Sequence, residues 1–111
     1  MKAKEKKKII RIAEALGWSF TDDGSDFNFR KYSPAGQDFN VSISARTVDE
    51  LKSELRSRSD DFDCSEEAHL WLDQSGHGKS GAPYDMRDVY EDMEACQEML
   101  TELCDALMEV A

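Results

Sequence analysis

Residues 85–110, DMRDVYEDMEACQEMLTELCDALMEV, form the longest uninterrupted periodic stretch of this 111-residue chain. Its apolar side chains recur every three or four positions, a spacing that predicts an amphipathic helix roughly 39 Å long. Asp85 can cap the first turn, and Pro83 stops a helix from entering from upstream. The apolar seam of this helix consists of Met86, Val89, Met93, Cys96, Leu100, Leu103, Leu107 and Val110.

The other sides of this helix are acidic. Residues 85–111 hold nine acids and one base, net −8, so residues 1–84 hold the other fifteen acids and thirteen bases, net −2, of a total of −10. A long row of carboxylates can imitate a phosphate backbone and occupy the groove of a basic, nucleic-acid-binding protein. The alternative is a solvated face that keeps the protein soluble. The residues expected to bind such a partner are Glu91, Asp92, Glu94, Glu98, Glu102 and Asp105.

The segment before this helix changes period from 3.6 to 2. Residues 3–16 have helical spacing and end at Gly17. Alternating apolar residues then predict three strands, near 18–21, 27–32 and 39–45, with turns at Asp23-Gly24 and Pro34-Ala35-Gly36 between them. The short turns predict an antiparallel meander. Its polar face, which we expect to be open to water or to a partner, carries Ser19, Thr21, Asn28, Arg30, Asn40, Ser42 and Ser44.

Two further helices precede the long one. Thr47 and Glu50 match a capping box, in which each side chain accepts from the other's backbone N–H, and this helix is expected to fray from Ser57. Asp63 or Ser65 caps the next helix. We therefore predict one α+β domain, residues 1–111, in the order α-β-β-β-α-α-α, with a three-stranded antiparallel meander, helices packed on one face and a long acidic C-terminal helix.

Composition and length limit the classes of protein to which this chain can belong. No apolar run reaches the roughly 20 residues of a membrane span, and the Lys-rich start lacks the apolar stretch of a secretion signal, so we expect a cytoplasmic protein without membrane contact. Three cysteines, an odd number, suggest free thiols. The seam of the long helix also suits a coiled-coil dimer, but Tyr90, Met99, Cys104 and Met108 widen it. We favour packing of this seam within one molecule, and the protein can be a monomer or a homodimer.

An enzymatic alternative, a small hydrolase or nucleotide-handling domain, centres on His69, Asp73 and the loop Gly76–Gly81, with His77 and Lys79. Gly78-Lys79-Ser80 matches the end of a phosphate-binding loop, but Asp73 occupies the place of its first glycine. His69 and Asp73 are four apart on one helix face, a spacing that simple charge complementarity also produces. The cysteines and histidines lack the paired spacing of a zinc site. We expect a non-enzymatic protein-interaction module without catalytic residue, cofactor or metal.

Direct nucleic-acid binding is not expected. The order helix, three strands, helix is that of the double-stranded RNA-binding module, which needs a Lys-rich start to the second helix, whereas this one begins Thr47-Val48-Asp49-Glu50. A net charge of −10 also opposes phosphate contacts. The basic residues Lys4, Lys7 and Lys8 of the first helix are expected to lie near the acidic helix in exposed ion pairs.

Residues 27–39, FNFRKYSPAGQDF, precede an acidic segment, a Gly-rich loop and an acidic helix. This arrangement resembles a group of small, acidic, functionally uncharacterised bacterial proteins over most of the chain. The resemblance implies no activity and no catalytic residue.

Overall fold

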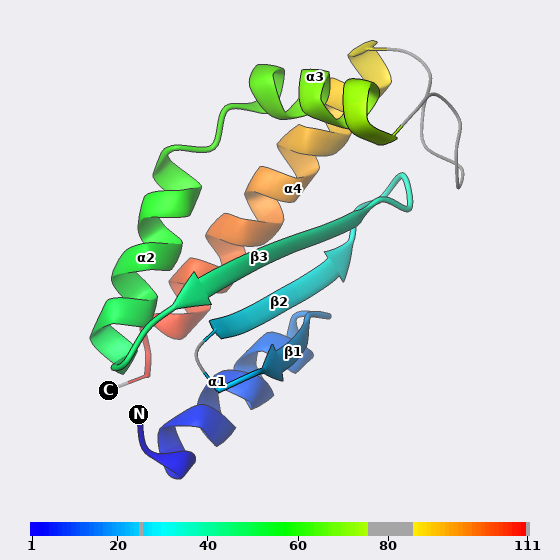
Figure 1. Cartoon of the computed structure of the whole chain (residues 1–111). Helices are drawn as coiled ribbons and strands as arrows, with labels where there is room; N and C mark the ends of the chain where they lie inside the picture. The colour runs from blue at the N-terminus through cyan, green and yellow to red at the C-terminus, as the bar shows by residue number, and fades with distance from the viewer. Residues whose placement is uncertain (25, 76–85, 111) are drawn as a thin grey trace.

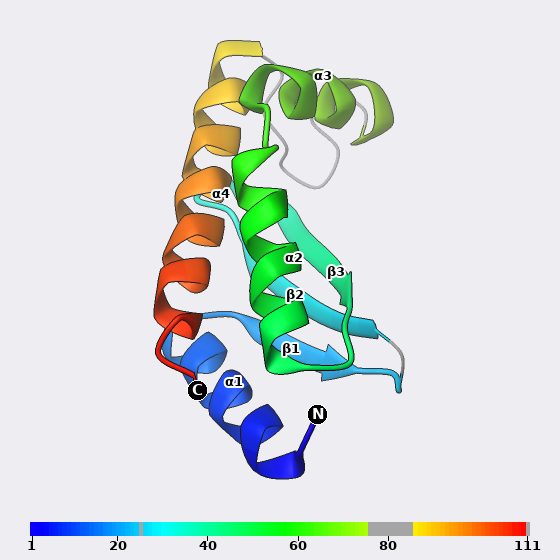
Figure 2. The same cartoon turned by 90° about the vertical axis from the view of Figure 1, so that its left-hand side faces the viewer.

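A computed structural model describes residues 1–24, 26–75 and 86–110 and confirms the α+β class and the predicted element order. Figures 1 and 2 show the sheet as one layer, with α2 and α4 side by side on one of its faces and α1 near one end. The elements are α1 (Ala3–Ala15), β1 (Ser19–Asp22), β2 (Asp26–Tyr32), β3 (Asp38–Ser44), α2 (Val48–Asp60), α3 (Cys64–Ser75) and α4 (Met86–Leu107).

The sheet is the predicted antiparallel meander, in the order β1-β2-β3. Phe29 of β2 pairs with Phe20 of β1 and with Val41 of β3. Because side chains alternate along a strand, this register turns Phe29 and Val41 inward together. Gly24 and Gly36 have φ values of 100° and 87°, which allow the two tight turns.

The seam of α4 packs within the molecule, as predicted. Every seam residue except Met86 is buried in the core, and Met99 and Cys104 widen the buried face. Leu103, for example, is 0% exposed. A second copy therefore cannot use this seam for a coiled coil. The remaining core is built from α1, the inner face of the sheet, α2 and α3, with Ile9, Phe29, Ile43, Leu51, Leu55 and Ala68 among its members.

The opposite face of the sheet is polar and carries no helix of the described residues, as predicted (Figure 2). Ser19, Thr21, Arg30, Asn40, Ser42 and Ser44 are exposed, and Asn28 is half-buried.

The helix starts differ in detail from the predicted caps. Glu50 N–H donates to Thr47 Oγ1 at 3.1 Å, but the Glu50 carboxylate accepts from Arg46 N–H at 2.8 Å instead of Thr47 N–H. Only half of the expected capping box is therefore present. Asp63 caps α3, because its Oδ1 accepts from Ser65 N–H at 3.0 Å. The predicted cap Asp85 and the loop 76–83 lie outside the described residues.

Helix α2 does not fray from residue 57. It continues to Asp60, because Ser59 is buried and its hydroxyl lies 3.0 Å from that of Thr101 on α4. Beyond its end, Phe62 packs edge-on against Phe39 of β3, with 5.9 Å between the two ring centroids. No helix of the described residues is long and apolar enough to cross a membrane.

Candidate acidic interface on the long helix

Five of the six acids predicted to bind a partner are exposed along α4, and we call these five the acidic stripe: Glu91, Glu94, Glu98, Glu102 and Asp105. They recur every three or four residues and therefore lie on one side of the helix. The stripe covers roughly 21 Å of helix, with one carboxylate about every 5 Å. Its four glutamates make no hydrogen bond or ion pair with the described residues.

Asp92, the sixth predicted acid, is not on this surface. It is only 5% exposed and faces the turn between β2 and β3. The expectation was wrong because Asp92 follows Val89 by three residues and precedes Cys96 by four, which places it on the seam side of the helix. That spacing was visible in the sequence. What the sequence did not show is which polar groups would compensate a buried carboxylate.

The β2–β3 turn supplies those groups. Asp92 Oδ2 accepts from Ser33 Oγ at 2.5 Å and from Gln37 Nε2 at 2.6 Å, and its Oδ1 accepts from Ala35 N–H at 3.0 Å. Ser33 Oγ in turn accepts from Gln37 N–H at 3.0 Å. A buried carboxylate is tolerated only when its oxygens are hydrogen-bonded. Asp92 therefore fixes the turn onto α4 and is not one of the exposed acids of this helix.

Asp105, at the C-terminal end of the stripe, has a partner within the molecule. Arg56 Nη2 on α2 lies 2.8 Å from Asp105 Oδ1. This hydrogen bond raises the pKa of the Arg56 guanidinium. The Asp105 side chain stays 66% exposed, so it can still be reached from solution.

Two shallow hollows flank the acidic stripe. One, of ≈ 430 Å³, lies between the β2–β3 turn and α4 and has walls from Pro34, Ala35, Glu91 and Ala95. The other, of ≈ 400 Å³, lies further along α4 and includes Glu98. Each hollow combines carboxylates with uncharged wall atoms, a lining that suits the aliphatic stem and charged head of a lysine or arginine.

His69 is the one residue of the alternative enzymatic site whose side chain is described, so this site stays a prediction. His69 is exposed on α3, and its Nδ1 lies 2.7 Å from Ser65 O within the same helix. Because a carbonyl only accepts, Nδ1 carries the proton in this contact. The side chain of Asp73 and the whole of His77, Lys79 and the loop 76–81 lie outside the described residues.

The three cysteines are free and buried. Burial, followed by the charge of Asp92, raises the pKa of Cys96 to about 12. Burial also raises the pKa of Cys64 and of Cys104. Thiols with raised pKa values are neutral at pH 7, so these cysteines are poor nucleophiles and poor metal ligands. No group of three or more His, Cys, Asp and Glu among the described residues is arranged to hold a metal.

The basic residues lie apart from the acidic stripe. Lys4, Lys7 and Lys8 are exposed on α1 and, contrary to expectation, none of them forms an ion pair with a described acid of α4. The nearby Lys6 instead pairs with Asp22 of β1 at 2.8 Å. The acidic stripe is therefore not neutralised by the basic first helix.

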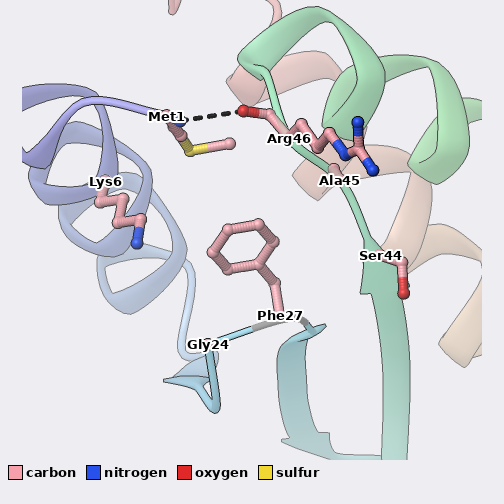
Figure 3. Close-up of a pocket in the computed structure, with 7 residues that line it drawn as sticks. All are labelled: Met1, Lys6, Gly24, Phe27, Ser44, Ala45 and Arg46. Atoms are coloured by element: carbon pink, nitrogen blue, oxygen red, sulfur yellow. Dashed lines mark hydrogen bonds between the residues drawn. The ribbon is translucent and has the colours of Figure 1, made fainter.

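A pocket of ≈ 510 Å³ opens where α1 meets the ends of β2 and β3 (Figure 3). Phe27 lies at its base, with Lys6 Nζ 5.7 Å from the ring centroid. Met1 N donates to Arg46 O at 2.9 Å and closes one side. The Arg46 side chain extends away from Lys6 and Phe27. The two cations, Arg46 and Lys6, therefore do not converge on one ligand position.

Comparisons with models of known protein families, with curated proteins and with solved structures found no match for this chain.

Proposed function

We propose that this protein is a non-enzymatic interaction module whose acidic stripe on α4 binds a basic protein. The observation that carries the proposal is the row of four exposed glutamates without an ion pair to any described residue. Surface carboxylates left unpaired along one straight helix attract a partner with the complementary charge pattern.

The spacing of the carboxylates in the acidic stripe indicates which class of basic partner fits it. Double-stranded DNA carries one charge per roughly 1.7 Å of axis, or 3.4 Å for each strand. The stripe carries one about every 5 Å, a lower density than that of a single DNA strand. It suits a basic helix with one Lys or Arg per turn better than a groove that follows a whole duplex. The partner can still be a nucleic-acid-binding protein, in which case the stripe imitates only part of a phosphate backbone.

The flanking hollows support the same partner. The hollow beside Glu91 has apolar walls from Pro34, Ala35 and Ala95. A lysine or arginine from the partner can lay its stem on these walls and direct its charge to the carboxylate. We also propose a cytoplasmic location, which suits three buried free thiols.

The test compares two variants with the same net charge. In the stripe variant, Glu91, Glu94, Glu98 and Glu102 become Gln. In the control variant, four exposed acids of α1 and α2, or just after α2, are neutralised: Glu14→Gln, Glu54→Gln, Asp60→Asn and Asp61→Asn. Titration calorimetry measures binding of a helical Ala-Lys peptide with one lysine per turn, at several NaCl concentrations.

We expect the stripe variant to bind this peptide about tenfold more weakly than the unmodified protein. The control variant should lose less than half as much binding free energy as the stripe variant loses. Added salt should weaken binding of the unmodified protein most. Equal losses in both variants would show that net charge alone attracts the peptide and would overturn the proposal. An affinity pull-down from the native host, eluted with increasing salt, then identifies the natural basic partner.

A further inference from the structure

The outer edge of β3 is a second surface with its own geometry. In the described sheet, β3 has β2 on one side and no strand on the other. Ser33 N–H donates to Gln37 O at 2.8 Å, and the register continues from this pair along both strands. Backbone groups alternate in direction along a strand. Phe39, Val41 and Ile43 therefore bond to β2, whereas Asn40, Ser42 and Ser44 turn their backbone N–H and C=O to the outer edge.

A side chain of α2 reaches this edge. Arg58 of α2 donates from Nη2 to Ser42 O at 3.2 Å, which confirms that this carbonyl points outward. Exposed edges invite pairing with another strand, and natural proteins cover them with charged side chains. Arg58 covers one carbonyl only.

The edge also carries little charge, because Asp38 at its start is the one charged residue of β3. Residues 39–44, FNVSIS, contain no charged side chain, in a chain of which 34% of residues are charged. Figures 1 and 2 show α4, which carries the acidic stripe, on one face of the sheet and not in line with the outer edge of β3. A second copy of this strongly acidic protein can approach β3 without bringing carboxylates of the two stripes together.

We propose that two copies pair antiparallel along their β3 edges, around a two-fold axis at Ser42, to form a six-stranded sheet. Ser42 then faces Ser42 of the second copy, and Asn40 faces Ser44, with two backbone hydrogen bonds for each facing pair. Val41 faces Ile43 on the inner, apolar side. Both faces of the combined sheet keep the character that they have in one copy.

Charge selects this register. With the axis at Ser42, Asp38 at the start of β3 in each copy comes near Arg46 of the other, two residues beyond the end of β3 at Ser44. Arg46 is exposed, its side chain makes no hydrogen bond or ion pair with the described residues, and in Figure 3 it extends away from Lys6 and Phe27. Asp38 already pairs with Arg30, and a second cation beside it is favourable. An axis shifted to Val41 places Asp38 opposite Ser44 and loses this match.

Arg58 competes with the second copy in this arrangement. In the dimer, the N–H of the second copy's Ser42 takes the place of Arg58 as donor to Ser42 O. Removing the Arg58 guanidinium therefore favours the dimer, whereas blocking the backbone of Ser42 prevents it. A general change in solubility would not produce these opposite effects on dimer formation.

Sedimentation of the full chain from micromolar to millimolar concentration tests the proposal. We expect a concentration-dependent dimer, which forms at about tenfold lower concentration in Arg58→Ala. Ser42→Pro should remain monomeric at every concentration. Proline is tolerated there because the Ser42 N–H does not bond to β2. Unchanged circular dichroism verifies that each variant is folded.

A charge exchange tests the register. Arg46→Glu places an acid opposite Asp38 and should weaken the dimer about tenfold, and adding Asp38→Lys should restore it. Arg11→Glu, the same charge change on α1, is the control and should have no effect on the dimer. The proposal is overturned if the unmodified protein and Arg58→Ala both stay monomeric, or if Ser42→Pro and Arg46→Glu dimerise as the unmodified protein does.

Discussion

Asp92 joins two distant segments through one side chain. Its carboxylate accepts hydrogen bonds from Ser33, Ala35 and Gln37, all more than fifty positions earlier in the chain. Every donor is uncharged, so the carboxylate is stabilised by three dipoles directed at it instead of by a cation. The same contacts hold the turn between β2 and β3 against the middle of α4.

Replacing Asp92 should destabilise the fold. Asp92→Ala leaves buried donors of Ser33 and Gln37 without an acceptor, and we expect a loss of about 3 kcal/mol in the free energy of unfolding, measured by urea denaturation. The control is Glu94→Ala, an exposed acid on the same helix, which should change stability by less than about 0.5 kcal/mol. Equal effects of the two substitutions would show that the turn contacts contribute little.

At the scale of elements, the start of α2 depends on Thr47. Thr47→Ala removes the acceptor of Glu50 N–H and should lower the free energy of unfolding by about 1 kcal/mol in urea denaturation. Thr47→Ser keeps the hydroxyl and should retain most of the stability. If Thr47→Ala is as stable as the unmodified protein, the bond from Arg46 N–H to Glu50 alone fixes this helix start.

The regular elements could be predicted from the sequence because each has a local signal. The seam of α4, the alternation in β3 and the turn at Gly36 depend on residues close in the chain. Local sequence patterns did not predict that α2 continues to Asp60, because Ser59 contacts Thr101 on a helix that is distant in the sequence. All six acids predicted to bind a partner were assigned to solvent, although the spacing of Asp92 places it on the seam side of α4, because the donors that compensate its burial come from the β2–β3 turn. Long-range polar contacts of this kind leave no periodic signal.

The whole molecule keeps its opposite charges apart. It measures 44 × 24 × 23 Å, with the basic α1 near one end and the acidic stripe along α4. The ion pairs Lys6–Asp22 and Arg56–Asp105 have partly exposed partners, so each contributes little to stability. Twenty-four acids against fourteen Lys and Arg leave a net charge of −10. Repulsion among carboxylates should therefore outweigh the exposed ion pairs.

Moderate salt should accordingly stabilise this protein. Raising NaCl from about 0.01 M to 0.15 M shortens the Debye length from about 30 Å to about 8 Å, and we expect the thermal midpoint to rise, with about 1 kcal/mol gained in the free energy of unfolding. The stripe variant, in which Glu91, Glu94, Glu98 and Glu102 are Gln, has a net charge of −6, since −10 plus four is −6. Its midpoint should rise less over the same range. A midpoint that falls as NaCl is added would mean that ion pairs outweigh the repulsion, and that the unpaired glutamates of the stripe do not dominate the electrostatics of this fold.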